Sequence, residues 1–348
     1  MQRMRQAALA AAVVFGSFGA TSFGQTGSAP AEGPAIGVRA IIHSVADLDK
    51  TVQFYRAGLG MEALGEGGKP LTAMPAPSLL NAELSRFTDT HGAKFRNAIL
   101  KIPGASITME LTEFSGIPIR HTQPHMQDPG ATTLILMVQD LDATLANVKK
   151  SGGTLLSLGG QPMKVGGENS KSRSVFVRDP DGFLLELAHL EPALPTKAPV
   201  GSNILGARIG LTIESTDQSM KFYRDVLGFE TKPGAAFATD KTIASLIDAQ
   251  GAQWRINSAK IPGTDVEWEL IEFKDIARTP FKLAVPDTGS PAVSVIVKDV
   301  PTALEAVKAG GGSVVTAGGK PIQFNNTPLV FVRDPNGFLI ELMQGPPR

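Results

Sequence analysis

The sequence predicts an α+β fold built from four copies of one βαβββ module, and repeats at two levels support this prediction. The segment FVRDPDGFLLEL at 176–187 returns as FVRDPNGFLIEL at 331–342, so the chain consists of two homologous halves. Within the first half, residues 36–114 and 131–190 each read as a strand, a helix and three further strands. Two modules in each half give four in the chain.

The elements of the first half follow from the spacing of apolar residues. In the first module we expect a helix at 47–57 and strands at 38–44, 61–64, 95–102 and 107–114. The second module repeats this order, with a helix at 141–150 and strands at 132–138, 154–157, 174–177 and 183–188. In the second half the segment from Lys260 to Phe273 repeats that from Lys101 to Phe114 at a constant offset of 159.

The repeated twelve residues predict a β-hairpin. A strand ends at Arg-Asp-Pro, where proline fixes φ, and the glycine that follows accepts a positive φ. The second strand of each hairpin carries a glutamate. The hairpins therefore deliver Glu186 and Glu341 to equivalent places.

Composition excludes some classes of function. The chain has 348 residues, and its 42% hydrophobic content is enough for a core in each of two domains. Its 33 basic and 33 acidic residues balance, and no basic stripe with interleaved aromatic residues occurs. We therefore expect a small-molecule ligand and no nucleic-acid partner.

The N-terminus predicts export to the periplasm or the medium. Arg3 and Arg5 precede an apolar run at 7–20 and then small and polar residues, which is typical of a signal peptide at 1–24. The run is shorter than the roughly 20 residues that span a bilayer, so we expect no membrane span in the mature protein. The chain has no cysteine, which excludes disulfides and a cysteine-linked lipid. We expect a disordered tether at 25–35.

The two halves are predicted to be separate domains. A proline-rich linker at 192–203 lies between a first domain at 36–191 and a second at 204–348. Long connections inside the first module of each half hold predicted short helices at 78–87 and 240–249, which could act as lids. The sequence leaves open whether the halves, or several chains, associate into a homo-oligomer.

These motifs resemble those of one known superfamily. Phe54-Tyr55-Arg56 with Leu59-Gly60, and the RDPDG…EL hairpin, resemble the vicinal oxygen chelate superfamily of glyoxalases, bleomycin-resistance proteins and extradiol dioxygenases. The resemblance covers nearly all of 36–345. It implies that two modules form an open cup of eight strands, that each half makes one glyoxalase-like cup, and that a divalent metal binds inside through ligands from first and last strands.

The last-strand ligand positions of the resembling family carry glutamates here. They are Glu110 and Glu186 in the first cup, and Glu269 and Glu341 in the second. Strand alternation independently directs these side chains into the cups, since the neighbours of each glutamate are apolar. Glu110 and Glu186 are thus the candidate catalytic residues and the candidate ligands of a divalent metal in the first cup.

The first-strand ligand positions of that family depart from its pattern. They correspond to Ala40, Thr133, Arg208 and Ala292, and none is histidine. Two carboxylates alone make a poor transition-metal site. We expect no metal in the second cup, where Arg208 would pair with Glu269 or Glu341, although Arg208 could instead lie solvated at the rim.

Four further residues are candidate ligand contacts. Arg96 and Arg255 each follow an aromatic residue and could hold an anionic or planar ligand, or could form an exposed strand pair. His121 and His125 lie in the connection between the first two modules, and we expect them at the mouth of a cup.

Two classes of function remain. The first is an exported binding protein of the bleomycin-resistance type, which encloses a small organic molecule without the full metal site. The alternative is a metal-dependent, glyoxalase I-like lyase or isomerase in the first cup, where Glu110 or Glu186 would move a proton. An extradiol-type dioxygenase is less favoured because its two histidines are replaced, and a purely structural role for one half also fits.

Overall fold

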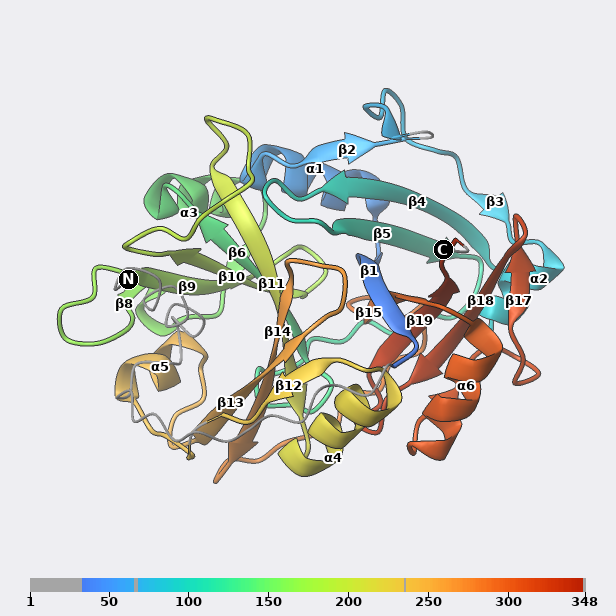
Figure 1. Ribbon diagram of the computed structural model, residues 1–348. Helices are drawn as coiled ribbons and strands as arrows, with labels where there is room; N and C mark the ends of the chain where they lie inside the picture. Colours follow the sequence, from blue (N-terminus) through green and yellow to red (C-terminus); the bar gives the residue numbers. More distant parts are fainter. Residues whose placement is uncertain (1–32, 66–67, 235, 347–348) are drawn as a thin grey trace, which may run out of the picture.

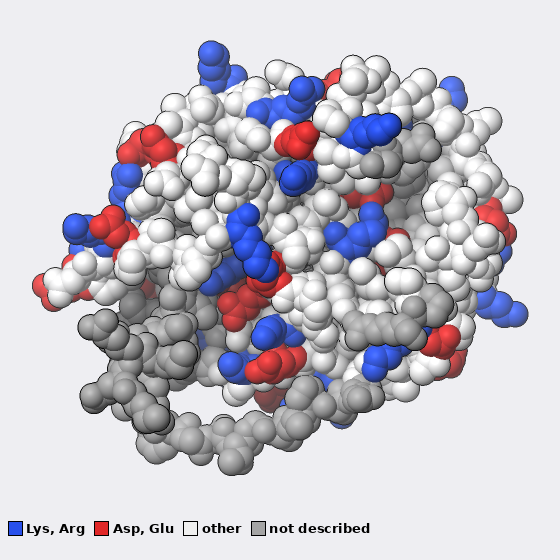
Figure 2. All heavy atoms as spheres, turned by 45° about the horizontal axis from the view of Figure 1, so that its top comes forward, with Lys and Arg blue, Asp and Glu red and all other residues white. Residues whose placement is uncertain are grey.

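The computed structural model describes residues 33–65, 68–234 and 236–346 (Figure 1). The predicted signal peptide and most of the predicted tether lie outside the described residues. No helix in the described ranges is long and apolar enough to cross a membrane. On the face in Figure 2, basic and acidic side chains are interspersed rather than gathered by sign.

The first half contains two βαβββ modules, as predicted. Module 1 contains β1 (Ala35–Val45), α1 (Leu48–Leu59), β2 (Glu62–Leu64), β3 (Ser78–Leu79), α2 (Ala82–Phe87), β4 (Lys94–Lys101) and β5 (Thr108–Ser115). Module 2 contains β6 (Thr132–Val138), α3 (Leu141–Lys150), β7 (Thr154–Leu155), η2 (Leu158–Gly160), β8 (Met163–Lys164), β9 (Arg173–Arg178) and β10 (Leu184–His189).

The second half repeats this order. Module 3 contains β11 (Ile204–Ile213), α4 (Thr216–Lys221), η3 (Phe222–Val226), β12 (Glu230–Lys232), α5 (Lys241–Leu246), β13 (Gln253–Lys260) and β14 (Glu267–Lys274). Module 4 contains β15 (Pro291–Val297), α6 (Val300–Ala309), β16 (Ser313–Val314), β17 (Ile322–Phe324), β18 (Thr327–Arg333) and β19 (Leu339–Gln344).

Local sequence signals set the ends of these elements. Asp47 caps α1 by accepting a hydrogen bond from the backbone N–H of Lys50 (3.0 Å), and Gly60 ends the helix with a φ of 68°. In the repeated hairpin, Asp179 Oδ1 accepts from the backbone N–H groups of Asp181 and Phe183, both at 2.9 Å. The turn predicted from Arg-Asp-Pro is therefore held by its own aspartate.

The four modules pair across the halves to form two sheets. Module 1 joins module 4 through antiparallel pairing of β1 with β15, and module 2 joins module 3 through β6 with β11. We call the concave faces of these sheets the 1–4 cup and the 2–3 cup. Each sheet has a continuous hydrogen-bonded path of eight strands, with short strands added beside it.

This pairing corrects the predicted contents of the cups. Glu110 shares a cup with Glu341, and Glu186 shares one with Glu269, so the expected pairs Glu110 with Glu186 and Glu269 with Glu341 are wrong. The strand patterns are the same under either pairing, so local sequence does not distinguish them. The connections at 116–131 and 275–290 are long enough to cross from one sheet to the other.

Three hydrophobic clusters hold the molecule together. The largest lies between the convex faces of the two sheets and contains the buried faces of the helices, including α1 packed against α3 (Figure 1). Trp268, fully buried there, would cost about 3–5 kcal/mol if truncated to alanine. The two smaller clusters lie one in each cup. Both sheets thus pack on one shared core, which holds the strands at the floor of each cup in place.

Candidate functional site

An arginine bridges two glutamates at the floor of the 1–4 cup. Arg39 Nη1 lies 2.8 Å from Glu110 Oε2, and Arg39 Nη2 donates to Glu341 Oε2 at 3.1 Å. Arg39 Nε donates to Ser294 Oγ at 3.2 Å, and Asn97 Nδ2 donates to the second oxygen of Glu110 at 3.1 Å. All three charged side chains are largely buried, with exposed fractions of 30% for Arg39, 14% for Glu110 and 6% for Glu341.

A β-bulge directs Arg39 into the cup. The register of β1 against β15 shifts between Val38 and Ala40, and both Val38 and Ile41 lie in the core between the sheets. These two core positions are three residues apart, whereas residues on one face of a regular strand are an even number of positions apart. The residue at the shift, Arg39, therefore projects toward the glutamates. Regular alternation predicts that residue 39 faces the core, so Arg39 could not be recognised from the sequence as a cup-facing residue.

The three charges depend on one another. Burial alone would lower the pKa of Arg39, but the adjacent carboxylates of Glu110 and Glu341 outweigh burial and raise it. Burial raises the pKa of Glu341, an effect that Arg39 opposes and Glu110 strengthens. Arg39 therefore stays charged, and removing it would leave two carboxylates facing each other in a cup with little water.

Above this floor lies an apolar cavity of about 480 Å³. Phe87 of α2 stacks on Phe331 of β18 with ring centroids 4.4 Å apart, and Phe95 meets Phe114 edge to face at 5.4 Å. The helix predicted at 78–87 is confirmed only over Ala82–Phe87, which forms α2, because Ser78–Leu79 forms β3. Thr316 Oγ1 holds the end of α2 by donating to the Phe87 carbonyl oxygen at 3.2 Å. The cavity volume lies within the range of about 300–1,000 Å³ that is typical of small-molecule binding sites.

The residues of this cup do not fit the divalent metal that the family resemblance implied. The glutamate positions are filled by Glu110 and Glu341, but the histidine positions hold Ala40 and Ala292, which carry no ligand atom. Arg39 already binds both carboxylates and would repel a divalent cation. Two carboxylates in an ion pair with a guanidinium do not make the three or four ligands of a transition-metal centre.

The floor of the 2–3 cup is deeply buried. It holds Glu186, which accepts from Ser174 Oγ at 2.7 Å, and Glu269, which pairs with Arg208 at 3.5 Å. Arg208 thus pairs with Glu269, as one of the two predicted alternatives stated, and not with Glu341. Above the floor lies a hydrophobic cluster that includes residues of α5, which spans Lys241–Leu246 within the helix predicted at 240–249.

Burial is the main influence on the pKa values of the two glutamates on this floor. It raises the pKa of Glu186 to about 8, with the Ser174 hydrogen bond opposing, and raises that of Glu269 to about 7, with Arg208 opposing. Glu186 is 1% exposed and Glu269 is 7% exposed. These two glutamates therefore lie buried beneath the hydrophobic cluster of this cup.

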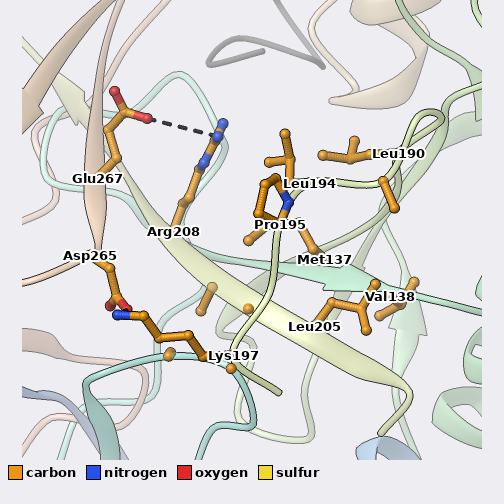
Figure 3. A pocket seen from close by; sticks show the side chains of 15 residues that line it. Met137, Val138, Leu190, Leu194, Pro195, Lys197, Leu205, Arg208, Asp265 and Glu267 are labelled. Carbon is orange, nitrogen blue, oxygen red and sulfur yellow. Dashed lines mark hydrogen bonds and ion pairs between the residues drawn. The ribbon is translucent and has the colours of Figure 1, made fainter. Parts of the chain in front are cut away.

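A small pocket of about 210 Å³ remains at the rim of the 2–3 cup. Figure 3 shows Arg208 beside Glu267, at 3.8 Å, with Leu194 and Pro195 of the linker on the other side. Lys197 pairs with Asp265 at 3.1 Å across the same opening. The linker thus lies over this pocket, where its charged groups are already engaged with one another.

The other predicted ligand contacts lie outside the cups. Arg96 lies on the opposite face of its sheet, where it bonds Glu113 and Asp49 at 2.6 Å each, and Arg255 bonds Glu272 in the equivalent place at 2.8 Å. Their aromatic neighbours Phe95 and Trp254 are the residues that face the cups.

The loop histidines also lie away from the cavity. His121 is exposed and pairs with Thr288 in an isolated bridge, while His125 is 72% exposed beside Asp128 at 3.4 Å. Neither lines the cavity of the 1–4 cup. Both instead belong to the connections that cross between the sheets.

His43 forms a buried cluster where modules 1 and 2 meet. Its Nε2 lies 2.9 Å from Asp179 Oδ2, which also accepts from the Tyr55 hydroxyl at 3.0 Å, and Asp181 accepts from Thr51 at 2.6 Å. His43, Asp179 and Asp181 each offer an atom within 4.8 Å of the others, a spacing compatible with a metal ion. In the other half the equivalents of His43 and Asp181 are Leu211 and Asn336. Because these side chains already bond one another, we interpret the cluster as structural.

Comparison with known proteins agrees with the fold. Over 190 residues the chain is 27% identical to lactoylglutathione lyase GLX1 of Arabidopsis thaliana, which covers 54% of this chain and 53% of that protein. The chain spans about half the length of this relative. A probable lactoylglutathione lyase of Vibrio parahaemolyticus is 26% identical over 136 residues, covering 38% of this chain and 86% of that protein.

A similar structure and a family model extend this agreement. The crystal structure of glyoxalase I from Zea mays aligns with a TM-score of 0.53 and 19% identity, covering 88% of this chain and 92% of that one. The family model described as Glyoxalase/Bleomycin resistance protein/Dioxygenase superfamily matches residues 39–187 and 207–342. Both halves of the chain, joined through shared sheets, therefore belong to the Glyoxalase/Bleomycin resistance protein/Dioxygenase superfamily.

Proposed function

We propose that the protein binds a small, largely apolar organic molecule in the 1–4 cup, without a metal ion. One observation carries this proposal: Arg39 bridges Glu110 and Glu341 at the floor of a cavity of about 480 Å³. The arginine supplies the charge that a metal would otherwise supply to the glutamates. We further propose that the protein is exported, as its first 24 residues predict.

Binding is tested by filling the cavity. Leu84 of α2 is half-buried and lines the cavity, so Leu84→Trp should obstruct it, whereas Leu158→Trp changes an exposed leucine outside it. An environment-sensitive apolar dye should bind the wild type and Leu158→Trp equally, and Leu84→Trp at least about tenfold more weakly. Equal binding to all three proteins would show that the cavity is not the site.

Metal independence is tested by elemental analysis of protein purified without a metal-binding tag. We expect less than one equivalent of zinc, nickel, manganese or cobalt, also after incubation with each metal and gel filtration. Arg39→His would remove the guanidinium and supply an imidazole, and should gain measurable affinity. One tightly bound metal per wild-type chain, lost in Glu341→Gln, would refute the proposal.

The second candidate function is that of a metal-dependent lyase. It is favoured by the names of the relatives, which are lactoylglutathione lyases, and by the glutamates at two of the family's ligand positions. In this case Glu110 or Glu341 would be the group that moves a proton. Metal-dependent formation of lactoylglutathione by the purified protein, abolished by Glu110→Gln, would favour this candidate over the first.

A further inference from the structure

The floor of the 1–4 cup has more acidic than basic side chains. It contains two carboxylates, Glu110 and Glu341, and one guanidinium, Arg39. Among the described residues that line the cavity, Arg39 is the one basic side chain. Between the apolar walls of the cavity the effective dielectric constant is lower than in bulk water, so a charge on these groups acts more strongly on a ligand than the same charge on the surface would.

The hydrogen-bonding capacity of the floor is also unbalanced. Each nitrogen of Arg39 donates once, to Ser294, Glu110 and Glu341, which uses three of its five N–H groups. A carboxylate has about four acceptor sites, and the bonds to Glu110 come from Arg39 and Asn97 alone in the described structure. The floor therefore offers a ligand more acceptors than donors.

The walls of the cavity require a different chemistry. Phe87, Phe95, Phe114 and Phe331 present ring faces and edges, and aliphatic side chains complete the lining. Planar apolar groups gain both burial and ring contacts against such walls. The wall and the floor thus select for two different parts of one molecule.

Building on the function proposed above, we infer that the ligand combines a ring-bearing apolar body with a positively charged nitrogen head. The body occupies the space between α2 and the strands of module 4. The head donates to Glu110 and Glu341 and balances the charge of the floor. Anionic ligands of the same shape are rejected, because the excess carboxylate repels them and Arg39 is already engaged.

Three naphthalene compounds of nearly equal size test this inference by isothermal titration calorimetry at pH 7.5. They are 1-naphthylmethylamine, which is cationic, 1-naphthalenemethanol, which is neutral, and 1-naphthoic acid, which is anionic. We expect the amine to bind at least about tenfold more tightly than the alcohol, and the acid to bind most weakly. Glu341→Gln and Glu110→Gln should each abolish the advantage of the amine and leave the alcohol's affinity within about threefold.

The matched control is Glu62→Gln, which removes an exposed carboxylate outside the cavity and should change none of the three affinities. If the alcohol or the acid binds as tightly as the amine, the inference is wrong while the proposed function stands. If none of the three compounds binds, and the apolar dye fails as well, the proposed function is wrong and the inference with it.

Discussion

The buried glutamate of the 2–3 cup, Glu186, should make the stability of this protein depend on pH. Burial raises the pKa of Glu186 from 4.5 to about 8, with Glu269 adding to the rise. The folded state therefore keeps a proton that the unfolded chain releases above about pH 4.5. The free energy of unfolding should fall as the pH rises from about 4.5 to about 8, and change little above that.

The expected size of this effect follows from the same shift. At about 1.4 kcal/mol per pH unit, the difference between 4.5 and about 8 sets a ceiling of about 5 kcal/mol. Relaxation of the surroundings reduces such effects, and Glu269 titrates beside Glu186, so we expect about 2–3 kcal/mol. Glu186→Gln keeps an acceptor for Ser174 and removes the charge, so it should abolish most of the loss.

Urea denaturation of the wild type and Glu186→Gln at pH 5.5 and pH 9 measures this effect. The two proteins should have similar stability at pH 5.5, and the variant should be more stable by about 2 kcal/mol at pH 9. Glu168→Gln, which removes an exposed carboxylate of the same module, should follow the wild type at both pH values. A variant no more stable than the wild type at pH 9 would show that Glu186 is solvated and that the 2–3 cup is open.

Three further predictions follow from the pairing of the modules and from the buried cluster. Residues 204–348 expressed alone should aggregate or dimerise, because β11 and β15 lose their partner strands. Co-expression with residues 33–203 should restore a soluble 1:1 complex, measured by light scattering. A monomeric, cooperatively melting fragment would contradict the shared sheets. His43→Leu should cost about 3 kcal/mol of stability because buried Asp179 loses its hydrogen-bond partner His43. Adding Asp181→Asn, which copies the amide that donates to Asp334 in the other half, should recover at least about 1 kcal/mol, and additive losses would show no coupling. Mass spectrometry of protein from the native host should find an N-terminus between about residues 20 and 30, and an intact Met1 would refute export.

The sequence predicted the parts that depend on local pattern. The modules, the Arg-Asp-Pro hairpins and the short helices at α2 and α5 follow from periodicity, capping and turn residues, which act over a few positions. The four glutamates face the cups as alternation requires. Arg208 was placed correctly because it lies after the register shift of β11, which falls between Ile204 and Gly206.

Two features could not be predicted, because each depends on distant residues. Which modules share a sheet is decided by how the crossing connections pack, and both pairings satisfy the same strand patterns. Arg39 enters the cup through a bulge that exists only against β15, more than 250 residues away. The one available signal was a charged residue between Val38 and Ile41 on a face otherwise expected to be apolar.

Equivalent positions show how the linings of the two cups differ. Phe95, Asn97 and Thr112 line the cavity of the 1–4 cup, and the residues 159 positions later are Trp254, Ile256 and Ile271, which belong to the cluster that fills the 2–3 cup. Two polar side chains are thus replaced by isoleucine and one ring by a larger one. These changes bury more apolar surface and remove hydrogen-bonding groups that a ligand could use. The 1–4 cup therefore keeps polar groups beside its cavity, while the 2–3 cup gains apolar packing above two glutamates whose pKa values burial raises.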